Sequence, residues 1–204
     1  MKTIYLVRHG FTHNPDQVFY PPDAPLDPVG VKELHALGTE MKHAGCKPTR
    51  IISSPYLRAR ESAEILSLEL GVPHVEFDER LVEWQVDGWI GKKLADFRHH
   101  VGYDHEPFTP DTNGIEDFPS MAARVRGAIS DAAETTPDEA CTVLVSHREP
   151  MVAAILTLQS KGFEDVPKLP FGKASAWRLR FDGTAFVDAV PAFDCSSPES
   201  KTLV

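Results

Sequence analysis

Two histidines follow apolar runs that read as buried strands, and this placement suits them for chemistry. His9 comes just after Ile4–Val7, and His147 comes just after Cys141–Ser146. In an open α/β sheet, ligands bind outside the carboxyl ends of the strands. Two histidines that leave two such ends can therefore share one pocket. A neutral imidazole there can serve as a nucleophile or exchange a proton near neutral pH.

Two arginines are expected to join these histidines. Arg8 lies between the first strand and His9. Arg58 follows another short apolar run, at 50–53, and falls in the first turn of the helix that comes next. Unpaired N–H groups at the start of a helix favour an anion. The sequence therefore predicts a pocket that holds a phosphate between two arginines and two histidines.

The elements that must position these residues alternate along the chain. Apolar runs with turn residues between them predict strands at 4–7, 50–53, 72–77, 141–146, 174–181 and 185–190. Apolar stripes and capping residues predict helices at 28–44, 56–70, 92–100, 117–134 and 150–158. This alternation is typical of an α/β fold, a three-layer α/β/α sandwich with a mostly parallel central sheet.

The chain length of 204 residues favours one compact domain covering 1–204. The segment at about 84–116 reads as a long loop region over the pocket, like a lid. The tail at about 194–204 is rich in serine and is expected to be frayed. His99, His100 and His105 lie in the lid region, and we expect them at an exposed surface rather than at a metal ion. Adjacent histidines on a helix point about 100° apart, which does not suit one ion.

Composition excludes several classes of protein. A formal net charge of −9 disfavours nucleic acid and anionic membranes as partners. The three cysteines stand far apart, which excludes a CxxC zinc or thioredoxin-like motif. The N-terminal segment lacks the features of a signal peptide, and the longest apolar stretch is too short to span a bilayer. A cytoplasmic location is the expectation.

A series of motifs in order along residues 6–175 resembles the histidine phosphatase superfamily, also called the phosphoglycerate mutase-like family. The matching segments are Leu6–Thr12 (LVRHGFT), Pro25–Gly30, Ser53–Ala63, Leu81–Gly91, Gly114–Glu116, Val145–His147 and Ala174–Ser175. A single RHG tripeptide would be weak evidence, but this ordered set is specific. The resemblance implies a phosphoglycerate mutase-like fold.

The resemblance also implies roles for individual residues. His9 would attack phosphorus and become phosphohistidine. Arg8, Arg58 and His147 would hold the non-bridging oxygens, where negative charge develops. Glu83 would protonate the leaving oxygen and then act as the base for water. No metal is implied, since cationic side chains take its place.

Four further residues are candidates with a less certain place in the pattern. Thr12 and Asn14 would contact the phosphate, although Asn14 stands one position earlier than the family's asparagine. Glu116 would either orient the nucleophile or cap the following helix. Arg148 stands where the family has glycine, and it would either reach a distal anionic group of the substrate or point to solvent.

Three functions remain open. The first is a metal-independent phosphatase that hydrolyses a small phosphorylated metabolite and needs no cofactor. The second is a phosphoglycerate mutase that uses the same residues and 2,3-bisphosphoglycerate. The mutase branch has a longer insertion before the second histidine than the 84–146 segment here, which favours the phosphatase. The third is a phospho-ligand-binding module without catalysis. A homodimer is expected by resemblance alone.

Overall fold

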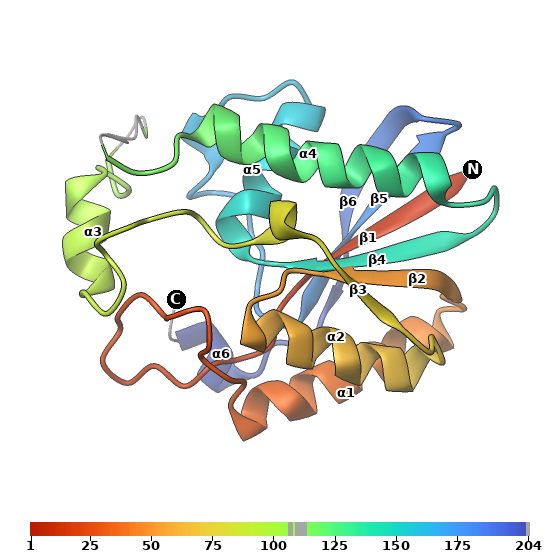
Figure 1. The fold of residues 1–204 in the computed structure, drawn as a ribbon, viewed down its shortest axis with the longest axis horizontal. Helices are drawn as coiled ribbons and strands as arrows, with labels where there is room; N and C mark the ends of the chain where they lie inside the picture. The colour runs from red at the N-terminus through yellow and green to blue at the C-terminus, as the bar shows by residue number, and fades with distance from the viewer. Residues whose placement is uncertain (106–107, 109–113, 203–204) are drawn as a thin grey trace.

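The computed structural model describes residues 1–105, 108 and 114–202, and a six-stranded sheet lies at its centre (Figure 1). The strand order is β3-β2-β4-β1-β5-β6. Their bounds are β1 Lys2–Arg8, β2 Pro48–Ser53, β3 Val75–Phe77, β4 Cys141–Ser146, β5 Ser175–Asp182 and β6 Ala185–Asp194. The strands β1 to β4 pair in parallel, whereas β5 and β6 pair antiparallel at one edge. The predicted mostly parallel sheet is confirmed.

Helices cover both faces of this sheet and complete the predicted three layers (Figure 1). One face carries α1 (Pro28–His43) and α2 (Leu57–Leu70), and the other carries α4 (Phe118–Thr135) and α5 (Arg148–Leu158). The remaining helical pieces are α3 (Leu94–His100), α6 (Pro198–Thr202) and the short 3₁₀ turns η1 (Glu79–Leu81) and η2 (Phe163–Asp165). Among the described residues, no helix has the length and apolar character needed to cross a membrane.

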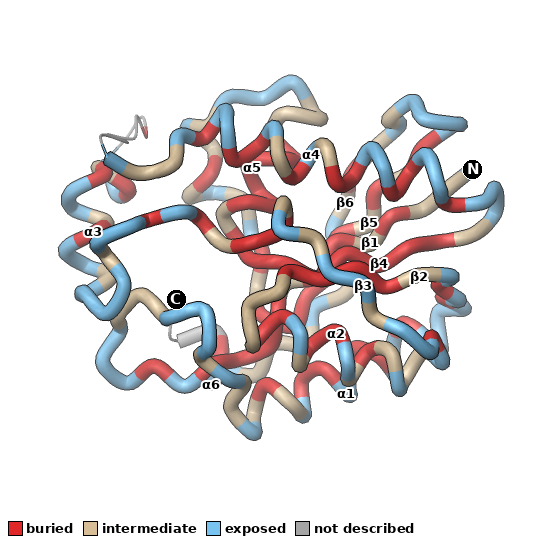
Figure 2. Tube along the Cα trace, viewed as in Figure 1, coloured by how far each residue is buried: buried red, intermediate tan, exposed pale blue. Residues whose placement is uncertain are grey.

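The central strands alternate their side chains between the two helical layers. In β1, Ile4 and Leu6 join the core under α4 and α5, whereas Val7 joins the core under α1 and α2. In β4, Leu144 belongs to the first core and Val143 to the second. This is the two-residue period of a strand buried on both faces. Figure 2 shows the centre of the sheet buried: β4 is buried at every residue, and β1 is buried at Ile4, Leu6 and Val7.

The start of α1 holds the loop that follows β1. Asp27 caps the helix, because its Oδ1 accepts a hydrogen bond from the amide of Val29 at 2.8 Å. The amide of Asp27 donates to the carbonyl of Phe11. A Cβ added at Gly30 would lie 2.2 Å from that same carbonyl oxygen. Only glycine at position 30 therefore allows the loop with His9 to rest on α1.

Two element boundaries differ from the predictions for local reasons. The third strand begins at Val75 instead of 72, because the amide of Val72 donates to Ser67 and closes the end of α2. Helix α5 begins at Arg148 instead of 150, because the carbonyl of His147 accepts from the amide of Met151. The first turn of α5 therefore lies next to His147.

The expectation of a frayed tail from Asp194 is wrong over 194–200. Strand β6 continues to Asp194, and the amide of Ser197 donates to Glu33 Oε1 at 2.7 Å. The other carboxylate oxygen of Glu33 accepts from the amide of Phe11. Ser200 is only 4% exposed. One buried carboxylate thus ties the tail to the loop after β1. Residues 203–204 lie outside the described part of the chain.

Candidate functional site

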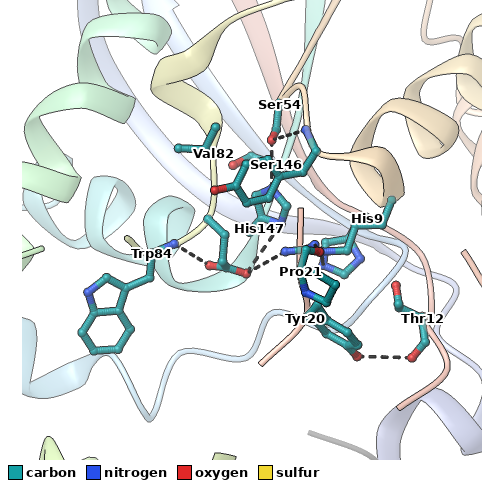
Figure 3. Close-up of polar contacts among 12 residues, drawn as sticks. His9, Thr12, Tyr20, Pro21, Ser54, Val82, Trp84, Ser146 and His147 are labelled. Carbon is teal, nitrogen blue, oxygen red and sulfur yellow. Dashed lines mark hydrogen bonds and ion pairs between the residues drawn. The ribbon is translucent and has the colours of Figure 1, made fainter. Parts of the chain in front are cut away.

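Three neighbouring parallel strands end at one place and deliver the candidate residues. Ser54, His147 and His9 directly follow β2, β4 and β1, which are adjacent in the sheet. The His9 amide donates to the carbonyl of Ser146, and the Ser54 amide donates to the carbonyl of Val145. The rings of His9 and His147 lie 5.2 Å apart between their centroids (Figure 3). The two histidines therefore lie together at the strand ends, as the sequence predicts.

His9 is held as a neutral imidazole with a defined tautomer. Its Nδ1 lies 2.8 Å from the carbonyl oxygen of Gly10, which can only accept, so Nδ1 carries the proton. Its Nε2 then has the lone pair, and Arg58 Nε donates to it at 3.3 Å. Burial, followed by the charges of Arg58 and Arg8, keeps the pKa of His9 well below the ordinary value. The ring therefore remains uncharged at neutral pH.

Arg8 and Arg58 line a cavity of about 340 Å³ beside these histidines. Arg8 Nη1 donates to the carbonyl of Phe171 at 2.7 Å, and its Nε is buried without a hydrogen-bond partner. The Arg58 guanidinium lies over the rings of Tyr20 and Tyr56, 5.2 and 5.4 Å from their centroids. These contacts hold two positive charges at the cavity wall. A buried N–H without an acceptor is suited to an incoming anion.

His147 lies between Ser54 and Glu83. Its Nε2 is 2.9 Å from Ser54 Oγ, and its Nδ1 is 3.5 Å from Glu83 Oε2 (Figure 3). Nδ1 is buried without a hydrogen-bond partner. Burial, and then the charge of Arg58, hold the pKa of His147 well below its usual range. This histidine can therefore offer a neutral ring to a ligand.

Glu83 is the carboxyl group of the site. Its Oε1 accepts from the amide of Trp84 at 2.9 Å, and its Oε2 lies 3.8 Å from Arg58 Nη2. Burial raises the pKa of Glu83 to about 7, and the nearby charge of Glu149 adds to this effect. A carboxyl with such a pKa can both donate and accept a proton near neutrality.

Asn14 and Thr12 are placed differently from each other. Asn14 lines the cavity, but its side-chain amide is bonded to the backbone of Val18 in both directions, at 2.8 and 3.0 Å. Thr12 is not among the cavity-lining residues, and its carbonyl accepts from the Tyr20 hydroxyl. Asn14 thus shapes the loop beside the cavity, and a phosphate contact of Thr12 or Asn14 stays a prediction.

The expected capping role of Glu116 is wrong, and an orienting role toward His9 stays a prediction, because its carboxylate accepts hydrogen bonds from Gln85 and Arg124. The cap of α4 is Asp117, whose Oδ1 accepts from the amide of Ser120. Glu116 instead holds Arg124 through both carboxylate oxygens, at 2.6 and 2.9 Å. Arg124 in turn donates to the carbonyl of Glu83 at 3.0 Å and to two carbonyls before it. Glu116 therefore supports the backbone that carries Glu83, one step away from the cavity.

Replacing Arg124 with alanine should lower the free energy of unfolding by about 2–4 kcal/mol, because three backbone acceptors and one buried carboxylate lose their donor together. Urea denaturation monitored by tryptophan fluorescence would measure this loss. Arg180→Ala is the matched control, because the side chains of Arg180 and its partner Asp188 are 42% and 31% exposed on β5 and β6. That change should cost less than about 1 kcal/mol. Equal losses for the two variants would contradict the supporting role of Arg124.

Arg148 does not point to solvent, which corrects one of its two expectations. Its guanidinium is buried, and it donates to the Tyr103 hydroxyl, to Glu149 and to the carbonyls of Val166, Pro167 and Leu169. It lines the cavity, but these acceptors engage both of its terminal nitrogens. Arg148 therefore ties the 166–169 loop to the start of α5.

Sequence reasoning missed several residues of the cavity wall. Tyr20, Tyr56 and Glu149 surround Arg58 and Glu83, and Lys173 lies on the side of Arg8. Burial, and then the charge of Arg8, lower the pKa of Lys173 to about 7. Glu149 sits in the first turn of α5, where acidic residues are favoured, and this signal could have found it. Tyr56 is the N-cap residue of α2, two residues before Arg58, whereas Tyr20 and Lys173 lie in loops where no local signal marks them.

One group of described residues could hold a metal ion. His9, Glu83 and His147 offer ligand atoms that all lie within 4.8 Å of one another. Arg58 contacts two of these side chains, and its positive charge opposes a cation there. His99, His100 and His105 are exposed, as expected.

Comparison with known proteins agrees with this geometry. The model of the histidine phosphatase superfamily (branch 1) matches residues 4–189. An uncharacterised protein of Mycobacterium tuberculosis is 29% identical over 196 residues, which cover 92% of this chain and 94% of that protein. "Probable phosphoglycerate mutase GpmB" of Salmonella arizonae is 29% identical over 157 residues, which cover 72% of this chain and 70% of that protein.

Solved structures share the fold. The mycobacterial glucosyl-3-phosphoglycerate phosphatase superposes with a TM-score of 0.77 at 22% identity, covering 94% of this chain and 97% of that one. Its likeness and the family match agree on the same α/β architecture over most of the chain. With two histidines, two arginines and one glutamate gathered at the strand ends, the chain belongs to the histidine phosphatase superfamily, branch 1.

Proposed function

We propose that this protein is a metal-independent phosphatase that hydrolyses a small phosphomonoester through a phosphohistidine intermediate. The observation that carries the proposal is the pairing of a neutral His9 with Glu83. The Nε2 lone pair of His9 faces Arg58 Nε, and Glu83 Oε2 lies 3.8 Å from Nη2 of the same guanidinium. A nucleophile and a proton donor thus flank one anion-binding group.

In the first half-reaction, the His9 Nε2 lone pair attacks phosphorus and the bond from phosphorus to the ester oxygen breaks. Arg8 and Arg58 neutralise the charge on the non-bridging oxygens, and the neutral His147 ring donates a hydrogen bond to them. The departing oxygen takes a proton from Glu83, because an alkoxide is a poor leaving group. The products are the free alcohol and phosphorylated His9, with Glu83 left as a carboxylate.

In the second half-reaction, water attacks the phosphoryl group of phosphorylated His9. Glu83 takes the proton that the water loses, and the bond between phosphorus and Nε2 breaks. Inorganic phosphate leaves, and His9 returns to its neutral form with Glu83 protonated. The raised pKa of Glu83 allows this one carboxyl to act in both directions near neutral pH.

The mutase is the second candidate, and the match to "Probable phosphoglycerate mutase GpmB" favours keeping it. It would use the same His9 and would need 2,3-bisphosphoglycerate to supply the first phosphoryl group. A binding module without catalysis is opposed by the presence of both the nucleophile and the proton donor. Interconversion of 2- and 3-phosphoglycerate that depends on the bisphosphate would decide for the mutase.

The test of the phosphatase is hydrolysis of 4-nitrophenyl phosphate with and without EDTA. We expect release of nitrophenolate at the same rate in both conditions, because arginines replace a metal at the phosphate. Loss of activity with EDTA and its return with added Zn²⁺ or Mn²⁺ would contradict the metal-free mechanism. Absence of hydrolysis in both conditions would contradict the phosphatase itself.

A further inference from the structure

We propose that the substrate of this site is a phosphomonoester of an uncharged, apolar alcohol, and that a second anionic group on the leaving side weakens binding. This inference rests on the proposed function, since it names the substrate class of the same cavity. It depends on what lines the cavity away from the arginines and histidines.

Part of the wall of this cavity is apolar. Two segments that are distant in the sequence, 17–22 and 84–97, form it together. They are joined by the backbone bridges of Val18 with Lys93 and of Phe19 with Ile90. The apolar and aromatic side chains that they present to the cavity are Phe19, Trp84, Val86, Ile90, Leu94 and Phe97.

Aromatic packing makes this wall rigid. The Phe97 ring is 2% exposed, and it meets the ring of Phe19 edge to face with centroids 4.6 Å apart. The ring of Trp84 meets Phe97 in the same way at 5.0 Å. Such contacts add to the free energy of burial and fix the ring positions. The wall is therefore a preformed apolar surface and not a set of mobile side chains.

The cationic side chains near this wall are engaged by other groups and offer few donors to a second anion of the substrate. Arg98 is paired with Asp104, and Arg148 is engaged by a hydroxyl, a carboxylate and three carbonyls. Three acidic residues, Glu83, Asp87 and Glu149, line the same cavity. Because Glu83 is protonated before the first step, a carboxylate or second phosphate on the leaving group would meet the negative charges of Asp87 and Glu149.

Among the described residues, Lys173 is a further cation of the cavity wall. Its ammonium lies 5.0 Å from the centre of the Phe11 ring, on the β1 side, and its pKa is lowered to about 7. It lines the cavity together with Arg8, which also borders a second cavity with it. Lys173 therefore adds positive charge near the transferred phosphate and not along the apolar wall.

Three alkyl phosphates test the proposal with the wild-type protein. Methyl phosphate, n-hexyl phosphate and the hexyl phosphate that ends in a carboxylate share a similar leaving oxygen. We expect kcat/KM to rise by at least tenfold from methyl to hexyl, because a buried methylene can add up to about fourfold. We expect the terminal carboxylate to reverse that gain.

A pair of variants tests the wall itself. Ile90→Asn changes an aliphatic side chain that is 48% exposed and lines the cavity. Leu68→Asn is the matched control, because Leu68 is 79% exposed on α2 and does not line it. We expect Ile90→Asn to lower the ratio of hexyl to methyl kcat/KM by about threefold or more. We expect Leu68→Asn to leave both values unchanged.

The outcomes distinguish the proposed substrate class from the proposed phosphatase activity. Hydrolysis of the carboxylate-ended substrate at the hexyl rate or faster would overturn the apolar assignment and leave the phosphatase standing. A ratio unchanged in Ile90→Asn would overturn the role of the wall. Failure of all three substrates together with 4-nitrophenyl phosphate would instead contradict the phosphatase.

Discussion

Replacing His9 with alanine should remove phosphatase activity, lowering kcat for 4-nitrophenyl phosphate by about 10⁴-fold or more. The reason is that the buried His9 ring holds a lone pair beside Arg58, the position from which phosphorus is attacked. Without Nε2, no covalent intermediate forms, and water must attack without an activated nucleophile. Initial rates at saturating substrate would measure the loss.

His13→Ala is the matched control for this change. His13 lies in the same loop, but its side chain is 69% exposed and faces Asp27 at 3.5 Å. We expect this variant to retain its activity. Quenching in alkaline detergent after incubation with ³²P-labelled 4-nitrophenyl phosphate would trap alkali-stable, acid-labile label on the wild-type protein and on His13→Ala, but not on His9→Ala. Full activity of His9→Ala would show that another residue is the nucleophile.

Particular residues show how much of the candidate site could be predicted from the sequence. His9, His147 and Arg58 could be placed together because each follows a buried parallel strand, and the ends of such strands meet. That rule depends only on strand order, which the apolar runs and the helices between them indicate. The structure adds what the rule lacks, namely which nitrogen of His9 has the proton and what faces it.

The failures share one cause. The expectations for Glu116 and Arg148 rest on the resemblance and on their place in the sequence, but their contacts come from helix α4 and from the 166–169 loop. Arg124, eight residues after Glu116, takes up its carboxylate, and the carbonyls of 166–169 take up the Arg148 guanidinium. A buried charge must find partners wherever the fold supplies them. The sequence likewise does not predict the apolar wall of 17–22 and 84–97, because the two segments that form it are distant in the sequence.

The tail provides a further case. Its composition suggested fraying, but Glu33 on α1 accepts hydrogen bonds from both Phe11 and Ser197. Glu33 is itself 4% exposed, so its carboxylate needs donors from the chain around it. The composition of 194–204 alone does not show that the Glu33 carboxylate needs hydrogen-bond donors from this segment. Order in the tail is thus linked to the loop that carries His9.

The second large effect concerns Glu83. Glu83→Gln should lower kcat for an alkyl phosphate by about 10²–10⁴-fold, because the alkoxide then leaves without a proton. With 4-nitrophenyl phosphate the first step should be affected far less, since nitrophenolate leaves unprotonated. The second step still lacks its base, so phosphorylated His9 should accumulate. Stopped-flow absorbance should then show a burst close to one nitrophenolate per protein molecule, followed by slow turnover.

The pH dependence gives an independent readout of the same carboxyl. Burial raises the pKa of Glu83 to about 7, and only its protonated form can act as the acid. For wild-type protein and an alkyl phosphate, kcat/KM should therefore fall tenfold per pH unit above about 7. His9 contributes no limb there, because its lowered pKa leaves it neutral throughout. In Glu83→Gln the alkaline limb should disappear.

Glu79→Gln is the matched control, since Glu79 is an exposed carboxylate four residues earlier that does not line the cavity. It should retain both the wild-type rate and the alkaline limb. If Glu83→Gln also kept that limb, the titrating group would have to be another one, and Lys173, whose pKa is lowered to about 7, would be the nearest alternative. Lys173→Met would then decide between them, because it removes that group and leaves the Glu83 carboxyl in place.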